Sequence, residues 1–217
     1  MILDKVLFLS AYSERSLAYA NAMLSKNVMP ACTLLFGKEK ANHLGKLENV
    51  VSDFDSKIVN IEADDVNDDS VFREIIKYKP KLIIYSGYGG QIVGKNILQT
   101  NIPVLHIHGG WLPDYRGSTT IYYSLLKEHR CGASAILLSS KIDSGIIVKR
   151  KKYPAPKRGT DIDYVYDNEI RADLLIEVLA EWNEQKGFAQ AIKQDDNEGV
   201  MYYVIHPVLK HVAILSL

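Results

Sequence analysis

The segment Val104-Leu-His-Ile-His-Gly-Gly-Trp-Leu-Pro-Asp-Tyr-Arg-Gly117 contains the strongest structural signal in the sequence, because an apolar run ends in two histidines and then breaks into a loop. If residues 102–108 are extended, alternate side chains point to opposite faces, so His106 and His108 share one face. The glycines and the proline of the loop let its backbone approach a ligand closely. Two imidazoles at the carboxyl end of a strand indicate chemistry, although an isolated His-x-His is more often a polar end to a core strand.

A second signal lies in Ser139-Ser-Lys-Ile-Asp-Ser-Gly145, which is followed directly by the β-branched run 146–148. The composition is typical of a turn that leads into a strand. A turn at this point would hold a carboxylate over the two histidines. His106, His108 and Asp143 are therefore the candidate catalytic residues.

Together these two segments resemble the folate-dependent formyltransferase family, whose pattern is Asn-x-His, a loop carrying Leu-Pro-x-Tyr-Arg-Gly, and Asp-x-Gly near a later strand. The resemblance covers residues 79–152 well. It implies a Rossmann-like fold and formyl-tetrahydrofolate, in its 10-formyl form, as the donor. His108 and Asp143 match two catalytic positions of the family, whereas His106 stands where the family has Asn. Either the imidazole does what the amide does, or the chemistry has changed.

The resemblance also implies ligand contacts, because in the family one turn passes alongside the pterin ring and a later turn wraps it through backbone atoms. The implied cofactor neighbours are Tyr88, Gly90, Gln91, Ile92, Ser139, Ser140 and Lys141. Substrate contacts are expected at the carboxyl ends of the strands, where open α/β sheets bind ligands. These residues are Tyr12, Ser13, Arg15, Gly109, Trp111, Tyr115 and Arg116. A capping or surface role for the first three, and bracing of the loop by Arg116, are the alternatives.

Apolar runs and helical patterns alternate along the first half of the chain. Strands are expected at 5–10, 30–36, 56–61 and 82–85, and helices at 13–25, capped by Ser13, and at 68–77. This alternation with short connections predicts an α/β fold with a doubly wound, mostly parallel sheet.

The second half predicts a helix at 118–128 capped by Ser118, strands at 134–138 and 146–149, and a closing helix at 161–182. The expected buried stripe of the closing helix is Val165, Ile170, Leu174, Leu175 and Leu179. The basic run 149–152 is interpreted as a solvated strand end. We expect a formyltransferase-like domain over 1–187 and a C-terminal extension over 188–217, which packs on the domain or on a partner subunit.

The chain has 217 residues, of which 47% are hydrophobic and 24% charged, as in ordinary soluble proteins. Its 26 basic and 26 acidic residues give no electrostatic case for nucleic acid as a partner. The absence of a membrane-length apolar run or a signal segment predicts a cytoplasmic protein without membrane contact. Cys32 and Cys131 have apolar neighbours and no metal or redox spacing, which predicts buried free thiols and no metal.

Transfer of a formyl group to an amine needs a donor for the developing oxyanion and an acceptor for the proton of the amine. By resemblance, His108 polarises the formyl oxygen and moves the proton, while Asp143 holds and charge-matches His108. The acceptor is argued by exclusion. The chain has neither the length nor the charge for the basic C-terminal domain of methionyl-tRNA formyltransferases, and no glycine-rich phosphate turn follows its first strand. A nucleotide-linked amino sugar for polysaccharide biosynthesis remains, with a small hydroxamate-forming amine as a variant.

Two other classes of function stay open at this point. One is a non-catalytic protein that binds folate or a sugar nucleotide on the same fold. The other is a metal-dependent hydrolase that uses His106, His108 and Asp143. A homodimer is also open, because Tyr202, Tyr203 and His206 could form a subunit contact, close over a substrate, or pack on the sheet.

Overall fold

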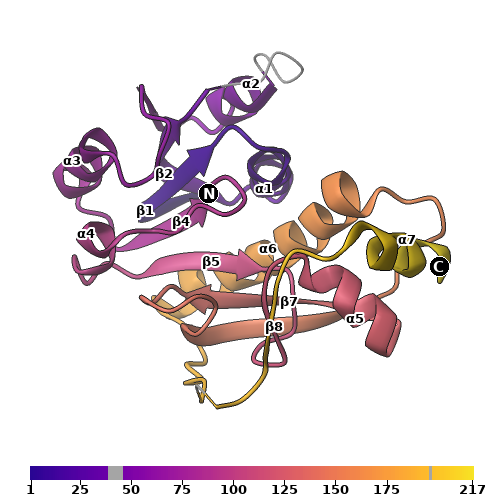
Figure 1. Cartoon of the computed structure of the whole chain (residues 1–217). Coiled ribbons are helices and arrows are strands. Elements are labelled where there is room, and N and C mark those ends of the chain that lie inside the picture. The colour runs from indigo at the N-terminus through magenta and orange to yellow at the C-terminus, as the bar shows by residue number, and fades with distance from the viewer. Residues whose placement is uncertain (39–45, 196) are drawn as a thin grey trace. The chain divides into compact units, whose positions relative to one another are not determined.

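The computed structural model describes residues 1–38, 46–195 and 197–217. The chain forms two compact units, Met1–His106 and Ile107–Leu217 (Figure 1). Both units combine strands with covering helices, so the predicted α/β class with a mostly parallel sheet is confirmed. The expected division of the chain at 187/188 stays a prediction.

In the first unit, parallel strands alternate with helices, and neighbouring strands follow the order β3-β2-β1-β4-β5. The elements are β1 (Ile2–Ala11), α1 (Glu14–Ser25), β2 (Met29–Phe36), α2 (Lys46–Ser52), β3 (Lys57–Ile61), α3 (Asp69–Tyr78), β4 (Leu82–Ser86), α4 (Lys95–Leu98) and β5 (Val104–His108). The order turns back at β1, which is the doubly wound pattern that the sequence predicts. The short helices α2 and α4 were not predicted.

Burial explains why the first strand is continuous in apolar residues. Leu7, Phe8 and Leu9 are all fully buried, so both faces of β1 are covered, as expected for a central parallel strand. The predicted cap of α1 is confirmed, because the side chain of Ser13 accepts a hydrogen bond from the backbone N–H of Ser16.

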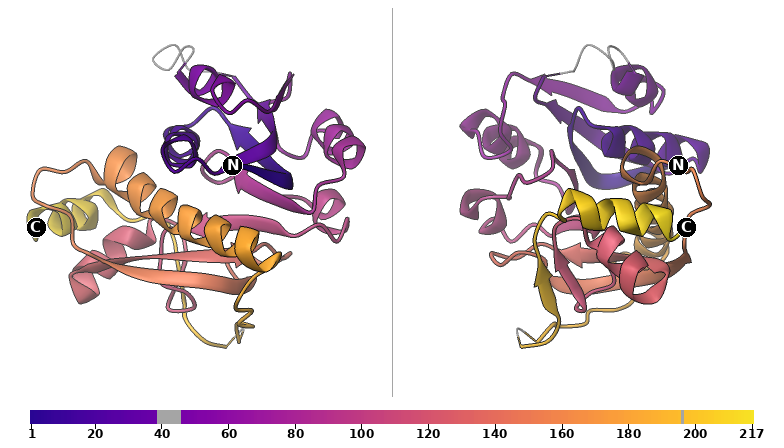
Figure 2. Two further views of the ribbon diagram at one scale, coloured as in Figure 1. Left: turned by 180° about the vertical axis from the view of Figure 1, so that it is seen from behind. Right: turned by 45° about the vertical axis from the view of Figure 1, so that its right-hand side comes forward.

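The second unit begins with the end of β5 and contains an antiparallel pair and a short parallel pair of strands. Its further elements are β6 (Tyr115–Gly117), α5 (Thr120–Glu128), β7 (Arg130–Leu137), β8 (Ile146–Pro154), a π-helical turn (Ile162–Tyr166), α6 (Asp167–Gln185), β9 (Val200–Tyr202) and α7 (Pro207–Leu215). Strand β7 pairs antiparallel with β8, and β6 pairs parallel with β9. Helix α6 runs along the β7–β8 pair, and α7 lies beside α5 (Figure 2).

The sequence predictions for the cap of α5 and for Val165 were wrong. Ser118 does not cap α5, because its N–H donates to Tyr202 O and so belongs to the β6–β9 ladder. The cap is Thr119, whose hydroxyl accepts from Ile205 N instead of from its own helix. Val165 is not part of the buried stripe but is 42% exposed, since the wider π-helical turn places it on the outer side. The other four stripe residues are buried.

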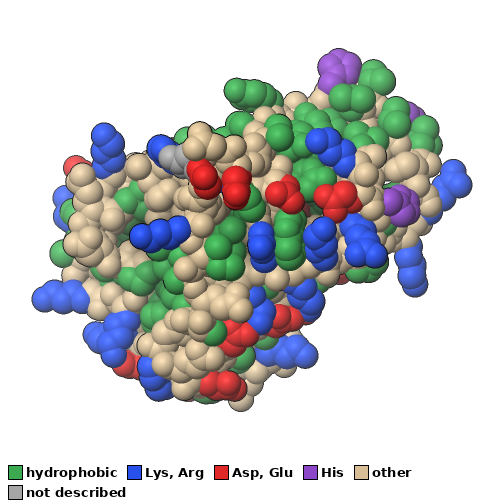
Figure 3. All heavy atoms as spheres, turned by 90° about the horizontal axis from the view of Figure 1, so that it is seen from below, with side chains coloured by type: hydrophobic (Ala, Val, Ile, Leu, Met, Phe, Trp, Pro, Cys, Tyr) green, Lys and Arg blue, Asp and Glu red, His purple; other side chains and the backbone are tan. Residues whose placement is uncertain are grey.

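The sequence suggested that the basic run of β8 is a solvated strand end. In the structure its lysine side chains are partly exposed and are paired with acidic residues. Lys149 and Lys151 both form ion pairs with Glu177 of α6, at 3.3 and 2.6 Å. Lys152 pairs with Glu128 of α5 at 3.1 Å. The face of the molecule in Figure 3 likewise carries acidic and basic side chains next to one another. The lysines of β8 therefore link this strand to α5 and α6 through ion pairs.

The two cysteines are buried and free, as predicted. Burial raises the pKa of the Cys32 thiol to about 11 and that of the Cys131 thiol to about 12. Both thiols are therefore protonated and chemically quiet at neutral pH. Among the described residues, no helix combines the length and apolarity needed to cross a membrane.

Candidate functional site

The side chain of His108 is held at the carboxyl end of β5 with one nitrogen already committed. The residue is only 5% exposed, and its Nε2 lies 2.7 Å from the backbone oxygen of Tyr115. A carbonyl oxygen can only accept a hydrogen bond, so Nε2 must carry the hydrogen. In the neutral ring, Nδ1 is then the nitrogen with the lone pair.

Asp143 lies beside His108, where the sequence predicts a carboxylate, and it faces the Nδ1 side of the ring. Its Oδ1 is 3.5 Å from His108 Nδ1, and its Oδ2 accepts a hydrogen bond of 2.8 Å from the N–H of Gly117. Asp143 has φ 51°, in the left-handed region that Asp tolerates better than most residues. The strained backbone aims the carboxylate at His108, while Gly117 fixes its second oxygen.

The environment favours the neutral form of His108. Burial lowers the pKa of this imidazole below its ordinary value, and the positive charge of Arg171 acts in the same direction. The carboxylates of Asp143 and Asp167 oppose the shift without overcoming it. At neutral pH the ring therefore offers an unprotonated Nδ1 beside a carboxylate, which is the arrangement of a proton acceptor whose charged form is stabilised.

Two further charged residues near His108, Arg171 and Asp167, lie one turn apart on α6. Neither was predicted from the sequence. Arg171 donates from Nη1 to the backbone oxygen of Ile107 at 3.1 Å and pairs with Asp167 at 2.6 Å. Both side chains are only 15% exposed. The signal was available, because an Asp and an Arg at i and i+4 interrupt the apolar stripe of the closing helix.

The loop that follows His108 is anchored on the β7–β8 pair. The hydroxyl of Ser134 donates to Gly110 O at 2.7 Å and accepts from Leu112 N at 3.0 Å. The guanidinium of Arg150 donates to Leu112 O and lies over the ring of Trp111 at 4.4 Å. Trp111 thus lies against the side chains of β8.

Gly110 is required by close packing against the histidine. A Cβ atom at this position would lie 2.7 Å from His108 Nε2 and 2.8 Å from the backbone oxygen of Tyr115. These are the two atoms of the hydrogen bond that fixes the ring. A side chain at 110 would push them apart.

The other loop residues that were expected to contact substrate have partners within this unit. Tyr115 donates from its hydroxyl to Glu128 at 2.8 Å, and Arg116 binds Gln194 at 3.1 Å. Gly109 O accepts from the hydroxyl of Thr120. Their assignment to substrate stays a prediction.

His106 belongs to the first unit and precedes His108 by two residues on the same strand. The alternation of the strand gives both side chains the same facing direction. His106 is half-buried, and its ring lies 6.1 Å from that of Tyr85, at a tilt of 45°.

The turn after β4 holds the residues that were assigned to the cofactor. Tyr88 donates from its hydroxyl to Lys38 O at 3.2 Å, and Gln91 donates to Asp64 O at 3.0 Å, so both side chains reach toward the ends of β2 and β3. A Cβ at Gly90 would meet no atom within 4 Å, and the side chain of Ile92 is 59% exposed. The outer side of the turn is therefore open to a ligand.

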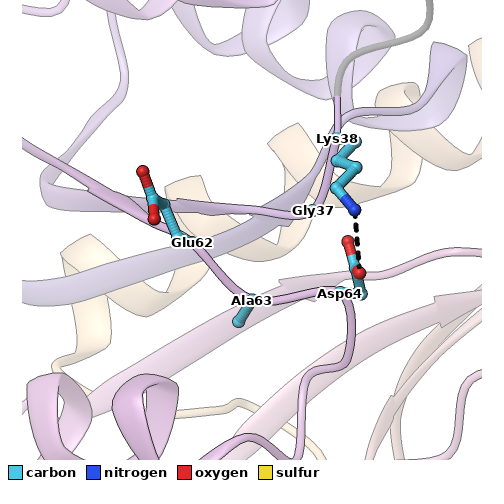
Figure 4. Close-up of a pocket in the computed structure, with 5 residues that line it drawn as sticks. All are labelled: Gly37, Lys38, Glu62, Ala63 and Asp64. Atoms are coloured by element: carbon cyan, nitrogen blue, oxygen red, sulfur yellow. Dashed lines mark hydrogen bonds and ion pairs between the residues drawn. The ribbon is translucent and has the colours of Figure 1, made fainter.

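A pocket of about 460 Å³ lies at the carboxyl ends of β2 and β3 in the same unit (Figure 4). It is lined by Gly37, Lys38, Glu62, Ala63 and Asp64. The side chains of Lys38 and Asp64 point toward one another and form an ion pair at 3.2 Å, but both are largely exposed. The pocket lies at the carboxyl edge of the sheet, where open α/β sheets bind ligands, but beside β2 and β3 and not at β1, where the strand order turns back.

The remaining predicted contacts lie on two turns. Ser139 donates to Lys141 O at 3.2 Å, and Ser140 and Lys141 are exposed with Ile142, which is 50% exposed. In the first unit, Tyr12 donates to Glu48 at 2.6 Å, and Arg15 donates to Ser86 and Gly87 O. Ser13 caps α1. Within the described part of the chain, no group of three or more His, Cys, Asp or Glu side chains is arranged to hold a metal.

A buried histidine at a strand end with an aspartate beside it is an arrangement that suits an enzyme which moves a proton on a bound ligand. Comparison with known proteins makes this specific. The chain belongs to the formyl transferase family, whose model matches residues 6–172. Members of this family use formyl-tetrahydrofolate as the formyl donor.

Individual relatives differ in what they act on. A methionyl-tRNA formyltransferase from Ligilactobacillus salivarius (strain UCC118) is 25% identical over 174 residues, which cover 79% of this chain and 53% of that protein. The chain thus spans about half the length of the curated relatives that it matches.

Several solved structures are similar over nearly the whole chain. A sugar N-formyltransferase from Shewanella sp FDAARGOS_354 has a TM-score of 0.61 and 18% identity, covering 97% of this chain and 87% of that chain. A phosphoribosylglycinamide formyltransferase from Anaplasma phagocytophilum has a TM-score of 0.66 and 12% identity, covering 91% and 97%. At these identities the likeness concerns the fold.

Proposed function

We propose that this protein is an N-formyltransferase that moves a formyl group from formyl-tetrahydrofolate to the amine of a small substrate. The observation that carries the proposal is the His108–Asp143 pair, in which Nε2 is held by Tyr115 O and Nδ1 faces a carboxylate at 3.5 Å. The arrangement orients one nitrogen for proton transfer and supports the charge that this nitrogen would gain.

The donor supplies a formyl carbon that is bonded to nitrogen and open to attack by an amine. The turn after β4 fits such a ligand. Its glycines Gly89 and Gly90 leave open space where a Cβ would lie, and Ile92 offers an exposed apolar side chain to a flat ring. Backbone groups of this turn would hold the ring, as the resemblance implies.

The chain's own residues would then handle the proton and the developing charge. As the amine bonds to the formyl carbon, His108 would accept its proton at Nδ1, and Asp143 would stabilise the resulting imidazolium. When the bond between the formyl carbon and the donor nitrogen breaks, the imidazolium would return this proton to that nitrogen, which leaves as tetrahydrofolate. The N–H at Nε2 stays bound to Tyr115 O, so the ring does not turn when it is charged. A positioned acid or base of this kind contributes about a hundredfold to ten-thousandfold in rate.

His106 takes the place of the Asn in the family pattern and would donate a hydrogen bond to the formyl oxygen. One such donor contributes about a hundredfold to a thousandfold in rate. An imidazole titrates near neutrality, whereas an amide does not. The protein should therefore show a pH dependence that an Asn at this position would remove.

As the acceptor we propose a nucleotide-linked amino sugar. A tRNA acceptor would call for a net basic surface, but the 26 basic and 26 acidic residues cancel. The basic run of β8 is already paired with acidic residues of α5 and α6. A glycinamide ribonucleotide acceptor would be expected to use closely spaced glycines after the first strand, and 10–15 contains none.

The first test is calorimetric titration with 5-formyltetrahydrofolate of the wild type, Gly90→Phe and Gly159→Phe. Both glycines have positive φ, 83° and 85°, and open space at Cβ, so the two variants carry the same backbone strain. We expect binding that Gly90→Phe weakens at least about tenfold and Gly159→Phe leaves unchanged, since a contact at a single position is worth roughly 1–3 kcal/mol.

Absence of binding at millimolar ligand would refute the folate assignment. If Gly90→Phe bound the ligand as tightly as the wild type, the ligand would have to bind away from this turn. If the wild-type protein binds the folate, it is then incubated with 10-formyl-tetrahydrofolate and a panel of amines. Mass spectrometry should find one added formyl group on a nucleotide-linked amino sugar and none on glycinamide ribonucleotide or methionyl-tRNA.

A further inference from the structure

Gln194 lies outside the segment that matches the family model, yet it binds the turn that carries Asp143. Its side-chain amide donates from Nε2 to Asp143 O at 2.8 Å and to Gly145 O at 2.7 Å. These are two backbone oxygens of one turn. The single amide group therefore closes the turn from outside.

The same side chain also binds the loop that follows the histidines. Gln194 Oε1 accepts from Nε and Nη2 of Arg116, at 3.3 and 3.1 Å. Arg116 further donates to the backbone oxygen of Asp195 at 2.9 Å, and it is only 6% exposed. Gln194 is thus a partly buried bridge between Arg116, which is buried, and the 143–145 turn.

Backbone pairing fixes where Gln194 lies. Ile192 and Ile147 exchange two backbone hydrogen bonds of 2.9 Å in an antiparallel bridge on β8. Because β8 begins directly after the Asp143 turn, this bridge brings residue 194 to that turn. The position does not depend on the side chain alone.

Asp143 needs such support, because its backbone is in the left-handed region with φ 51°. A residue other than glycine stays in this region only when its surroundings hold it there. The carboxylate has one fixed contact, Gly117 N–H, and the backbone oxygen of the same residue has Gln194. Together they define the direction in which Oδ1 faces His108.

We propose that Gln194 is a positioning residue, which fixes the Asp143 turn through its amide N–H groups and so keeps the carboxylate opposite His108 Nδ1. The inference rests on the proposed function for its kinetic consequence only. Arg116 acts with it by orienting the amide, because its two N–H groups bind the oxygen end and leave the nitrogen end for the turn.

Three variants test this role. Gln194→Ala removes both ends of the bridge. Gln194→Glu keeps and strengthens the acceptor for Arg116, but it places a carboxylate oxygen against the backbone oxygens of Asp143 and Gly145. Gln190→Ala is the matched control, because Gln190 lies in the same segment and is exposed. If only the contact with Arg116 matters, Gln194→Glu retains activity; if the amide donors matter, it does not.

We expect both Gln194 variants to lower kcat by about tenfold to a hundredfold, the effect of misplacing a catalytic group by roughly 1 Å. The KM for the amine and the affinity for 5-formyltetrahydrofolate should change less than about threefold, since neither ligand contacts Gln194 in this scheme. Gln190→Ala should match the wild type in all three quantities.

Hydrogen exchange of the Gly117 amide gives a readout that needs no substrate. The Gly117 N–H donates to the Asp143 carboxylate, so its exchange should accelerate by about tenfold or more when the turn is released. Faster exchange in both Gln194 variants and normal exchange in Gln190→Ala support the proposal, even if the wild type transfers no formyl group. Unchanged exchange and unchanged kcat in Gln194→Glu would overturn it.

Discussion

The ring of His108 and the backbone oxygen of Tyr115 are 2.7 Å apart, and this contact determines which nitrogen of the imidazole is available for chemistry. Because Tyr115 O accepts from Nε2, the neutral ring has its lone pair at Nδ1, where Asp143 lies at 3.5 Å. Tyr115 begins β6, the strand that also supplies Gly117 N–H to Asp143. One short strand thus orients both members of the pair.

Replacement of Asp143 should separate its charge from its backbone role. Asn tolerates the left-handed conformation and can still accept from Gly117 N–H, so Asp143→Asn should fold with an unchanged melting temperature. The variant lacks the charge that stabilises a protonated His108, and its kcat should fall by about a hundredfold to ten-thousandfold. Formyl-transfer kinetics and a thermal melt check both expectations.

Asp143→Ala is the contrasting variant. Alanine in the left-handed region costs about 1 kcal/mol, and the partner of Gly117 N–H is also lost, so this variant should melt at a lower temperature. Normal kcat in Asp143→Asn would show that the negative charge has no part in the reaction.

The depressed pKa of His108 predicts how stability depends on pH. Burial lowers this pKa below the ordinary value of 6.5, which is the value that applies in the unfolded chain. Below about pH 6.5 the unfolded state binds a proton that the folded state refuses, so folding loses free energy as the pH falls. The contribution is fully present above that pH and is lost as the pH falls toward the folded pKa, by at most about 1.4 kcal/mol for each pH unit.

Urea denaturation between pH 8 and pH 5 measures this effect in the wild type, His108→Gln and His211→Gln. The free energy of unfolding should fall more steeply with decreasing pH in the wild type than in His108→Gln. His211, exposed on α7, serves as the control and should follow the wild type. A wild type that gains stability at low pH relative to His108→Gln would mean that the charges of Asp143 and Asp167 outweigh burial and Arg171.

Sequence patterns were sufficient for the central strands of the first unit and for α1 and α3, because these strands are buried and both helices begin at a side-chain cap. The short helices α2 and α4 were missed, and the N-cap of α4 makes no side-chain hydrogen bond. The run around Phe8 and the cap at Ser13 could be read directly. In the second unit the decisive contacts are distant in sequence. Gln194 binds a turn 51 residues earlier in the chain, and Thr119 is bound by Ile205. Hydrophobic periodicity does not indicate contacts between residues so distant in sequence. The bridge formed by Gln194 and the cap of α5 at Thr119 were therefore missed.

The candidate site shows the same division. The pairing of His108 with Asp143 was predicted from two motifs and a resemblance, and the structure brings these side chains together. The contacts of Arg116 were not predictable, because a guanidinium on a loop can face a ligand or the protein. Its partner is a glutamine in a segment with no periodic pattern.

Gly110 should be sensitive to a single added carbon. In Gly110→Ala the new Cβ would press on His108 Nε2, on Tyr115 O and on the hydroxyl of Thr120, at 2.7, 2.8 and 2.9 Å. Overpacking of this kind costs about 1–3 kcal/mol. The variant should melt at a lower temperature and lose kcat together, because the atoms displaced are those that orient the imidazole. Gly187→Ala, whose Cβ would meet nothing within 4 Å, should change neither quantity.

Variants of His106 examine the one departure from the family pattern. His106→Asn restores the amide of that pattern, keeps a hydrogen-bond donor and removes a titrating group from β5. Its kcat should stay within about tenfold of the wild type, while His106→Ala, which has no donor, should lose about a hundredfold to a thousandfold. The pH profile of kcat discriminates further, because an amide does not titrate, so any ionisation that His106→Asn retains must belong to another group. Equal activity of His106→Ala and wild type would mean that the formyl oxygen is stabilised by another group, and the backbone N–H groups of the loop after His108 would be the next to test.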